Sequence, residues 1–250
     1  MKNIRRSVLL ILVLSAIVSC AHTFAKKKDE SLIHYRMGVV YFNDKSYTDA
    51  LKEFTTAIDI YSEDPSYHKE LGLTYFMKGM NNEAIKSLKQ AISLNPKFSE
   101  ARVALAAVYI VEKRWDDAID ESRQALGNIF YRTPEFAYYN MGIAYLNKND
   151  LQNSLESFRK AVEMRPNYAD AYYKIGFVLD KMNNMKEAAE AYEKAVKIYP
   201  DYLDAHFALG LSYLKLRDKA QALKAFDRVI VLAPDSDKAA EAREYIKLIK

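Results

Sequence analysis

The sequence predicts an all-α protein, built as a solenoid of repeated helix pairs. Half of its 250 residues are hydrophobic and 28% are charged, a composition that supports a packed core and excludes a disordered chain. Only seven Gly and six Pro occur, although sheet turns and phosphate-binding loops both consume glycine. Five of the glycines follow a 34-residue period, with one double interval of 70: Gly38, Gly72, Gly142, Gly176 and Gly210.

The N-terminus has the features of an export signal. Lys2, Arg5 and Arg6 precede an apolar stretch over residues 7–18. As a helix these twelve residues would span about 18 Å, too short for a hydrocarbon core of about 30 Å. A basic segment followed by a short apolar one is typical of a secretory signal peptide. We therefore predict a signal peptide over residues 1–19.

Three ways of processing this segment compete. Residues 17–20, Ile-Val-Ser-Cys, resemble a bacterial lipobox, although the strongest pattern has Leu first and Gly or Ala before the Cys. Residues 23–25, Thr-Phe-Ala, could instead serve ordinary signal peptidase, and an uncleaved inner-membrane anchor is the third possibility. Cys20 is the only cysteine in the chain and lies directly after the predicted signal segment, which favours lipidation of Cys20.

A lipidated Cys20 would anchor the protein, because two or more acyl chains hold a protein stably on a membrane. Residues 20–30 would then be a lipidated tether. Ala21 follows the cysteine, and by resemblance to enteric-type sorting a residue other than Asp there permits transfer to the outer membrane. We expect a bacterial envelope protein, anchored in the outer membrane and facing the periplasm, with a soluble periplasmic protein as the alternative.

The net charge of +4 belongs to the N-terminal segment. Six basic and two acidic residues precede Ser31, and the rest of the chain carries equal numbers of each. A nucleic-acid-binding protein needs a basic face to displace counterions from phosphates. We expect no nucleic-acid partner.

Other positions recur with the glycines, and each recurrence has a mechanical reason. Ala106 fills the gap in the glycine series, and these six positions are here called the Gly/Ala slots. A small residue stands twelve positions after each Gly/Ala slot, where the two helices of a pair are expected to approach closely. A large apolar residue usually stands sixteen positions after it. All six prolines lie at repeat boundaries, where a proline ends a helix. The small residues are Ala50, Ala84, Ala118, Ser154, Ala188 and Ala222; the later set is Phe54, Leu88, Phe158, Tyr192 and Phe226, with Ser122 as the exception.

This pattern resembles the tetratricopeptide repeat from residue 31 to residue 236. The resemblance implies a right-handed α-solenoid of six repeats with a C-terminal capping helix over 237–250. We expect Ala240, Tyr245, Ile246 and Ile249 to face the last repeat. The repeats are assigned to residues 31–64, 65–98, 99–134, 135–168, 169–202 and 203–236.

The sequence lacks motifs typical of catalytic, nucleotide-binding or metal sites. There is one cysteine, no His-Glu-x-x-His pair and no Gly-x-Gly. We therefore predict that the protein is not an enzyme and has no catalytic residue, cofactor, metal or small-molecule substrate.

The resemblance implies that the first helix of each repeat lines a concave groove, where a helix or an extended peptide would bind. Lys69 matches one slot of the carboxylate clamp of chaperone-binding relatives, but Leu73 replaces the partnering Asn, which disfavours that class of client. The predicted groove residues are Tyr35, Val39, Phe42, Leu73, Phe76, Met77, Val103, Ile110, Phe136, Tyr139, Ile143, Tyr173, Phe177 and Phe207.

The third repeat has two extra residues, which widen the turn around Ile129, Phe130 and Tyr131. We expect Gly127 to end the preceding helix in the left-handed conformation and these three side chains to be exposed. The turn, the six repeats and the lipidation signal together resemble the type IV pilus pilotin family of outer-membrane lipoproteins. That resemblance implies a scaffold that captures a secretin subunit, through the groove or the widened turn, and assists its assembly or targeting. An adaptor lipoprotein of another envelope machine, such as barrel assembly, polysaccharide export or secretion, is the alternative.

Overall fold

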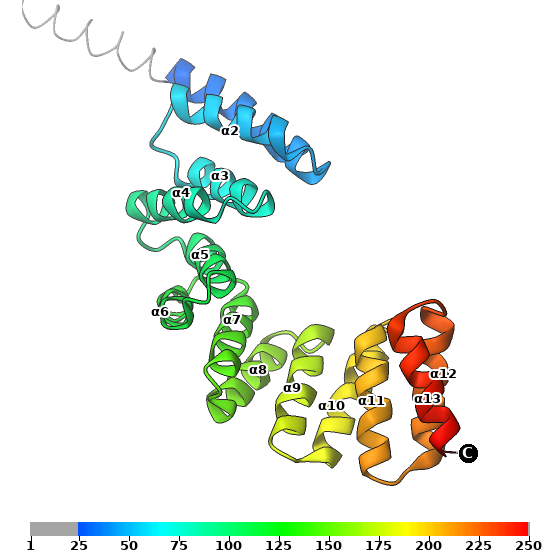
Figure 1. The fold of residues 1–250 in the computed structure, drawn as a ribbon. Coiled ribbons are helices and arrows are strands. Elements are labelled where there is room, and N and C mark those ends of the chain that lie inside the picture. The colour runs from blue at the N-terminus through cyan, green and yellow to red at the C-terminus, as the bar shows by residue number, and fades with distance from the viewer. Residues whose placement is uncertain (1–24, 250) are drawn as a thin grey trace, which may run out of the picture. The chain divides into compact units, whose positions relative to one another are not determined.

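The computed structural model describes residues 25–249, and every regular element in this range is a helix. The predicted all-α repeat fold is thus confirmed (Figure 1). The predicted signal peptide and Cys20 lie outside the described residues. After a helix that covers residues 25–43, the elements are α2 (Tyr47–Ile60), α3 (Pro65–Met77), α4 (Asn81–Leu94), α5 (Ser99–Val111), α6 (Trp115–Leu126), α7 (Pro134–Asn147), α8 (Leu151–Met164), α9 (Ala169–Lys181), α10 (Met185–Ile198), α11 (Leu203–Lys215), α12 (Lys219–Leu232) and α13 (Asp237–Ile249).

The chain divides into two compact units, Met1–Val108 and Tyr109–Lys250. In the first unit α3 packs against α4 and against α2. In the second unit each helix from α6 to α13 packs against the next one along the chain. This order of contacts is the nearest-neighbour packing of a repeat protein.

The turn that joins the two helices of each pair contains one residue in the left-handed conformation. These residues have φ between 58° and 73° and are spaced by 34 residues, except for an interval of 36 that contains the widened turn. The following N–H donates to the carbonyl five positions earlier, as from Asp150 to Tyr145 at 2.9 Å, which is a Schellman cap. The six are Lys45, Gly79, Lys113, Asn149, Asn183 and Arg217. Gly127, by contrast, has φ −67°, so the prediction of a left-handed Gly127 is wrong.

The recurring glycines make room for the large residue sixteen positions later. A Cβ atom on Gly142 would lie 2.6 Å from the nearest ring carbon of Phe158, closer than real side chains approach. Gly176 has the same relation to Tyr192. Each ring fills the centre of its repeat and is buried. The glycine therefore lets a helix backbone pack directly against an aromatic ring.

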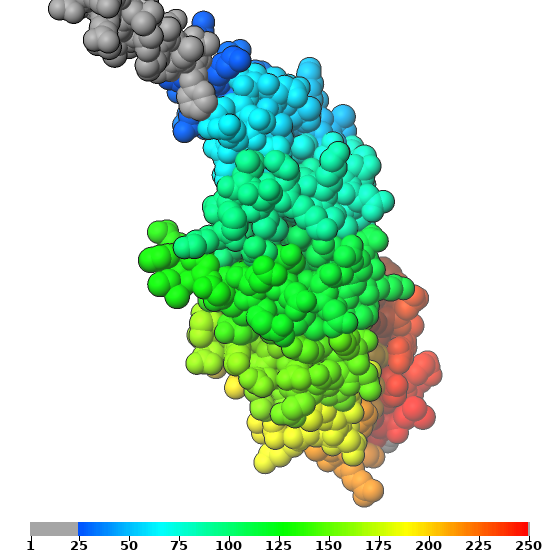
Figure 2. All heavy atoms as spheres, turned by 90° about the vertical axis from the view of Figure 1, so that its left-hand side faces the viewer, coloured from blue at the N-terminus to red at the C-terminus, as the bar shows by residue number. Residues whose placement is uncertain are grey.

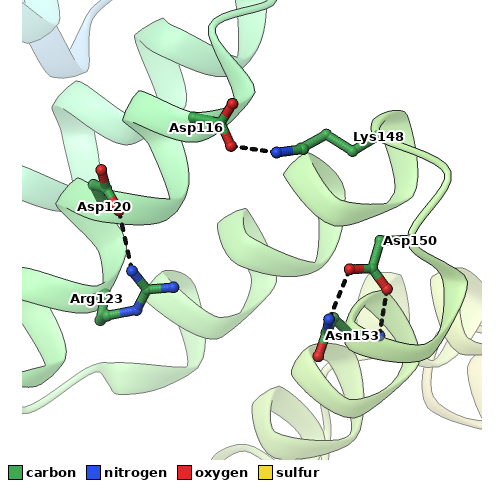
Figure 3. A network of polar contacts seen from close by, with 6 residues as sticks. All are labelled: Asp116, Asp120, Arg123, Lys148, Asp150 and Asn153. Atoms are coloured by element: carbon green, nitrogen blue, oxygen red, sulfur yellow. Dashed lines mark hydrogen bonds and ion pairs between the residues drawn. The ribbon is translucent and has the colours of Figure 1, made fainter.

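Polar contacts on the surface connect neighbouring repeats (Figure 3). Lys148, which follows α7, forms an ion pair with Asp116 of α6. In the first unit Lys78 donates to Thr48 at 2.9 Å, and these two residues occupy the equivalent repeat positions. Solvent screens such exposed contacts and keeps them weak, so they align repeats that the core holds together.

The C-terminal helix α13 covers the apolar side of α12. Tyr245 stacks on the ring of Phe226 with centroids 5.2 Å apart, and Ile249 is buried in the same cluster. Ala240, predicted to face the last repeat, is exposed, and Ala239 and Ala242 are buried instead. The buried residues 239, 242 and 249 keep the helical period, and residue 240 lies outside that stripe.

Residues 25–30, the later part of the predicted tether, are helical. They continue without interruption into the helix that reaches residue 43. Their side chains are exposed, whereas Ser31 is buried and its hydroxyl lies 3.1 Å from that of Tyr67. The packed part of the first repeat therefore begins at Ser31.

Candidate protein-binding site

The fourteen predicted groove residues all keep exposed surface. Met77 and Phe136 are exposed and the other twelve are half-buried, so none belongs to the fully buried core. Seven lie in the first unit, from Tyr35 to Val103, and seven in the second, from Ile110 to Phe207. The first helices of the repeats thus carry an apolar, partly solvated face within each unit.

In the first unit these residues rest on neighbouring rings. Tyr35 stacks on Tyr67 with centroids 4.9 Å apart, and burial raises its pKa. The ammonium group of Lys69 lies 2.7 Å from a carboxylate oxygen of Glu70 and over the ring of Phe98. Because Glu70 already neutralises Lys69, this position is not a free clamp for a partner's carboxylate.

The second unit gathers four tyrosines into one cluster, here called the tyrosine cluster. It consists of Tyr139 from α7, Tyr173 from α9, and Tyr168 and Tyr202 from the turns before α9 and α11. The ring centroids of Tyr139 and Tyr168 are 5.1 Å apart, and those of Tyr173 and Tyr202 are 5.2 Å apart. Phe136 extends the cluster in a T-shaped contact with Tyr168, with the two ring centroids 6.0 Å apart.

Sequence reasoning missed two members of this cluster, Tyr168 and Tyr202. Both end the four-residue connections between repeats, and they are 34 residues apart. Phe98 occupies the equivalent position of the second repeat. The recurrence of an aromatic residue in that slot is the signal that could have found them.

The cluster presents neutral hydroxyl groups. Burial raises the pKa of Tyr168 to about 12, with Asp170 adding to the effect. Burial likewise raises the pKa values of Tyr139 and Tyr173. Tyr202 donates a hydrogen bond to Asp170 at 2.8 Å. At neutral pH these groups are hydrogen-bond donors on an apolar surface.

Three cations lie over aromatic rings beside the tyrosine cluster. Lys174 is 5.5 Å from the Tyr173 centroid and 5.9 Å from that of Phe177. The ammonium group of Lys181 also lies over Phe177, 5.2 Å from the ring centroid. Arg165 lies 5.1 Å from the Tyr168 centroid. Lys174 is half-buried, and this burial lowers its pKa, an effect that Asp170 partly opposes.

The widened turn exposes two large apolar side chains. It spans residues 127–133, whereas the other connections between repeats have four residues. Ile129 is 87% exposed and Phe130 is 82% exposed, while Tyr131 is half-buried. The Asn128 side chain accepts from the backbone N–H of Phe130 at 3.0 Å, which fixes the turn. In Figure 2 atoms with the green of this segment project from the surface.

A second exposed apolar feature, on the helix over residues 25–43, was missed. Ile33, Met37 and Val40 lie along one stripe and are 60%, 40% and 58% exposed. Ala171, Ile175 and Val178, at the equivalent positions of the fifth repeat, are buried, and α8 packs against their helix. The stripe is exposed because no repeat precedes the first one among the described residues. Comparing the first repeat with the buried positions of the later repeats would have identified this exposed stripe from the sequence.

Two other properties concern the described range alone. No helix between residues 25 and 249 is long and apolar enough to cross a membrane. Over the same residues no group of three or more His, Cys, Asp or Glu side chains is arranged to hold a metal ion.

Family models decide how the repeats are classified. One tetratricopeptide repeat model matches residues 139–202 and 178–237, and another matches residues 75–127. The chain belongs to the tetratricopeptide repeat family. Together these matches cover parts of both units.

Solved tetratricopeptide repeat structures include two that resemble nearly the whole chain. PilF from Pseudomonas aeruginosa has a TM-score of 0.78 and 15% identity, over 87% of this chain and 99% of PilF. PilW, described as a type IV pilus biogenesis factor, has a TM-score of 0.79 and 16% identity, over 85% of this chain and 98% of PilW. MamA is 27% identical with a TM-score of 0.59, over 74% of this chain and 96% of MamA. No curated protein matches the sequence.

Proposed function

We propose that this protein is a non-catalytic scaffold of type IV pilus biogenesis, anchored by lipid in the outer membrane and facing the periplasm. In this proposal it binds a secretin subunit of the pilus machine and assists the targeting or assembly of the secretin ring. Its work is capture and positioning, and needs no cofactor.

The observation that carries the proposal is that PilF and PilW each align over nearly their whole length with most of this chain. Each aligns over at least 98% of its own length with at least 85% of this chain. MamA, although more identical in sequence, fits with a TM-score of only 0.59. The arrangement of this solenoid is thus more like those of the two pilus biogenesis proteins.

The anchor in this proposal is Cys20, the one cysteine of the chain. It is tested by metabolic labelling with a fatty-acid probe. Wild-type protein should be labelled, and Cys20→Ala should lose the label and leave the membrane fraction. Unchanged labelling of Cys20→Ala would disprove lipidation at this residue. A wild-type protein that is released in mature form without the label would support ordinary cleavage after Ala25.

Gel analysis of secretin multimers in a deletion strain tests the function. The strain should accumulate secretin monomers and lack surface pili, and the wild-type gene should restore both. Complementation with Cys20→Ala separates the anchor from the solenoid. Normal SDS-resistant multimers and normal piliation in the deletion strain would remove the pilus proposal and favour an adaptor of another envelope machine.

The binding surface is tested by two separate variants. Phe136→Asp with Phe177→Asp places charges on the partly exposed face of α7 and α9, and Ile129→Ser with Phe130→Ser removes the apolar side chains of the widened turn. Crosslinking to the secretin in cells identifies which pair is needed. Circular dichroism must show that each variant keeps its helices, because unfolding would assign the changed residues to the core instead.

A further inference from the structure

We propose that the tyrosine cluster, with Lys174, Lys181 and Arg165 around it, binds an extended segment of the partner in which a carboxylate stands between apolar side chains. The inference rests on the proposed scaffold function and names the chemistry of what the second unit captures. It concerns only the surface formed by α7, α9 and the turns that precede α9 and α11.

The first argument is the charge balance of this surface. Two of the nearby carboxylates have side-chain partners: Asp170 accepts from Tyr202 at 2.8 Å, and Asp180 lies 2.6 Å from the ammonium group of Lys215. Asp204 is likewise paired with Lys238. Within residues 25–249 the three cations over the rings have no carboxylate in ion-pair contact. The charge of Asp170 acts on Lys174 from within this surface, but each of the three cations can still form an ion pair with a carboxylate of a bound segment.

Lys174 is the centre of this argument. It is half-buried beside Tyr173 and Phe177, and its burial disfavours the charged form. A cation kept partly out of water gains from a carboxylate more than an exposed one does, because the local dielectric is lower. Lys215, on the next repeat, has a carboxylate partner at 2.6 Å, which shows the interaction that Lys174 lacks.

The rings supply the second half of the specificity. Phe136, beside Tyr168 and Arg165, and Phe177, beside Lys174, both keep exposed surface. Apolar side chains of a segment can therefore pack next to the charge. The raised pKa values of Tyr139 and Tyr168 keep both hydroxyl groups protonated. A lysine-rich or arginine-rich segment would meet three like charges on this surface and would be rejected.

A displayed library of random dodecapeptides tests the inference without knowledge of the partner. The full chain, purified in detergent, is the bait, in parallel with Lys174→Met, Lys174→Glu and the control Lys186→Met. Lys186 is exposed on α10 and makes no contact with a ring or a carboxylate in the described structure. Thermal unfolding of each variant is measured first, so that a lost ligand is not confused with a lost fold.

Peptides enriched on the wild type and on Lys186→Met should carry Asp or Glu next to Phe, Leu, Ile or Val. They should bind Lys174→Met at least about tenfold more weakly, a change of 1.4 kcal/mol. Lys174→Glu should select basic peptides instead. Enrichment of neutral or basic peptides on the wild type, the same peptides on all four baits, or no enrichment would overturn the inference. Normal secretin multimers in the deletion strain would overturn the pilus role and leave this peptide preference standing.

Discussion

The ring of Phe158 packs against the bare α-carbon of Gly142, at a distance where a Cβ atom would be 2.6 Å from the nearest ring carbon. Both residues are buried, so neither has room to move away. The same relation recurs between Gly210 and Phe226. In these repeats a single added carbon atom thus decides whether the two helices can pack without a shift.

Gly142→Ala should therefore destabilise the protein, although alanine is the better helix former. Overpacking a core costs about 1–3 kcal/mol, against a helix gain of about 1 kcal/mol. We expect a net loss of roughly 1–2 kcal/mol, measured by urea unfolding. Gly127→Ala is the control, because φ at Gly127 is −67° and its nearest neighbour is a backbone oxygen at 3.3 Å. Equal stability of Gly142→Ala and wild type would show that the ring can yield.

Two buried serines form a matched pair. The hydroxyl of Ser154 donates to the carbonyl of Gly142 at 2.9 Å, whereas that of Ser122 has no hydrogen-bond partner among residues 25–249. Ser154→Ala should cost about 1 kcal/mol, and Ser122→Ala should be neutral or stabilising by about 1 kcal/mol, because an unsatisfied buried hydroxyl is removed. Thermal unfolding of both variants gives the comparison. A loss of stability in Ser122→Ala would mean that its hydroxyl is satisfied after all.

His206 should make the protein less stable in mild acid. Its burial lowers its pKa below 6.5, and the neighbouring Arg228 acts in the same direction, while the hydrogen bond to the Pro200 carbonyl and the charge of Asp201 oppose this. The unfolded chain then binds the proton more readily, so stability is complete above about pH 6.5 and falls as the pH drops toward the folded pKa.

His206→Tyr is the variant that isolates this effect. Tyr138 and Tyr172 hold the equivalent position in two other repeats, so tyrosine fits the repeat. Between pH 7 and pH 5 the variant should lose less stability than the wild type in urea titrations. Identical pH dependence of the two proteins would exclude His206 as the group responsible.

Lys174→Met should raise the melting temperature. Because burial lowers the lysine pKa, the lysine destabilises the folded state at every pH below the ordinary lysine pKa, including pH 7. Methionine keeps the length of the side chain and removes the charge, so we expect a gain of a few degrees at most. Lys186→Met should have no effect. A melting temperature lowered by Lys174→Met would show that the contacts of the lysine with the rings outweigh its desolvation.

The repeat period was predictable because packing requirements repeat with it. Gly38, Gly72, Gly142, Gly176 and Gly210 each face a large residue sixteen positions on, so spacing alone revealed the helix pairs. Ala240 was misplaced because the recurring pattern stops at residue 236, so it does not set the register of α13, whose buried residues are Ala239, Ala242 and Ile249. Gly127 was misjudged because a glycine near a helix end permits the left-handed conformation without requiring it.

The candidate site was predictable only in part. Side chains of the first helices, such as Tyr139 and Tyr173, follow from the repeat, and their exposed face follows with them. The contact of Tyr202 with Asp170 joins different repeats, 32 residues apart, and depends on the angle between helices. The unpaired state of Lys174 depends equally on where every neighbouring carboxylate points, which no periodicity contains.

Five of the six left-handed turn residues are not glycine: Lys45, Lys113, Asn149, Asn183 and Arg217. Each such residue is held in a conformation that costs an L-amino acid roughly 1 kcal/mol, and glycine relieves this. The same substitution can therefore be made in five of the six helix pairs without touching the core. Such a series would measure cooperativity along the array. It would show over how many neighbouring repeats a local gain in the free energy of unfolding extends before the repeats unfold independently.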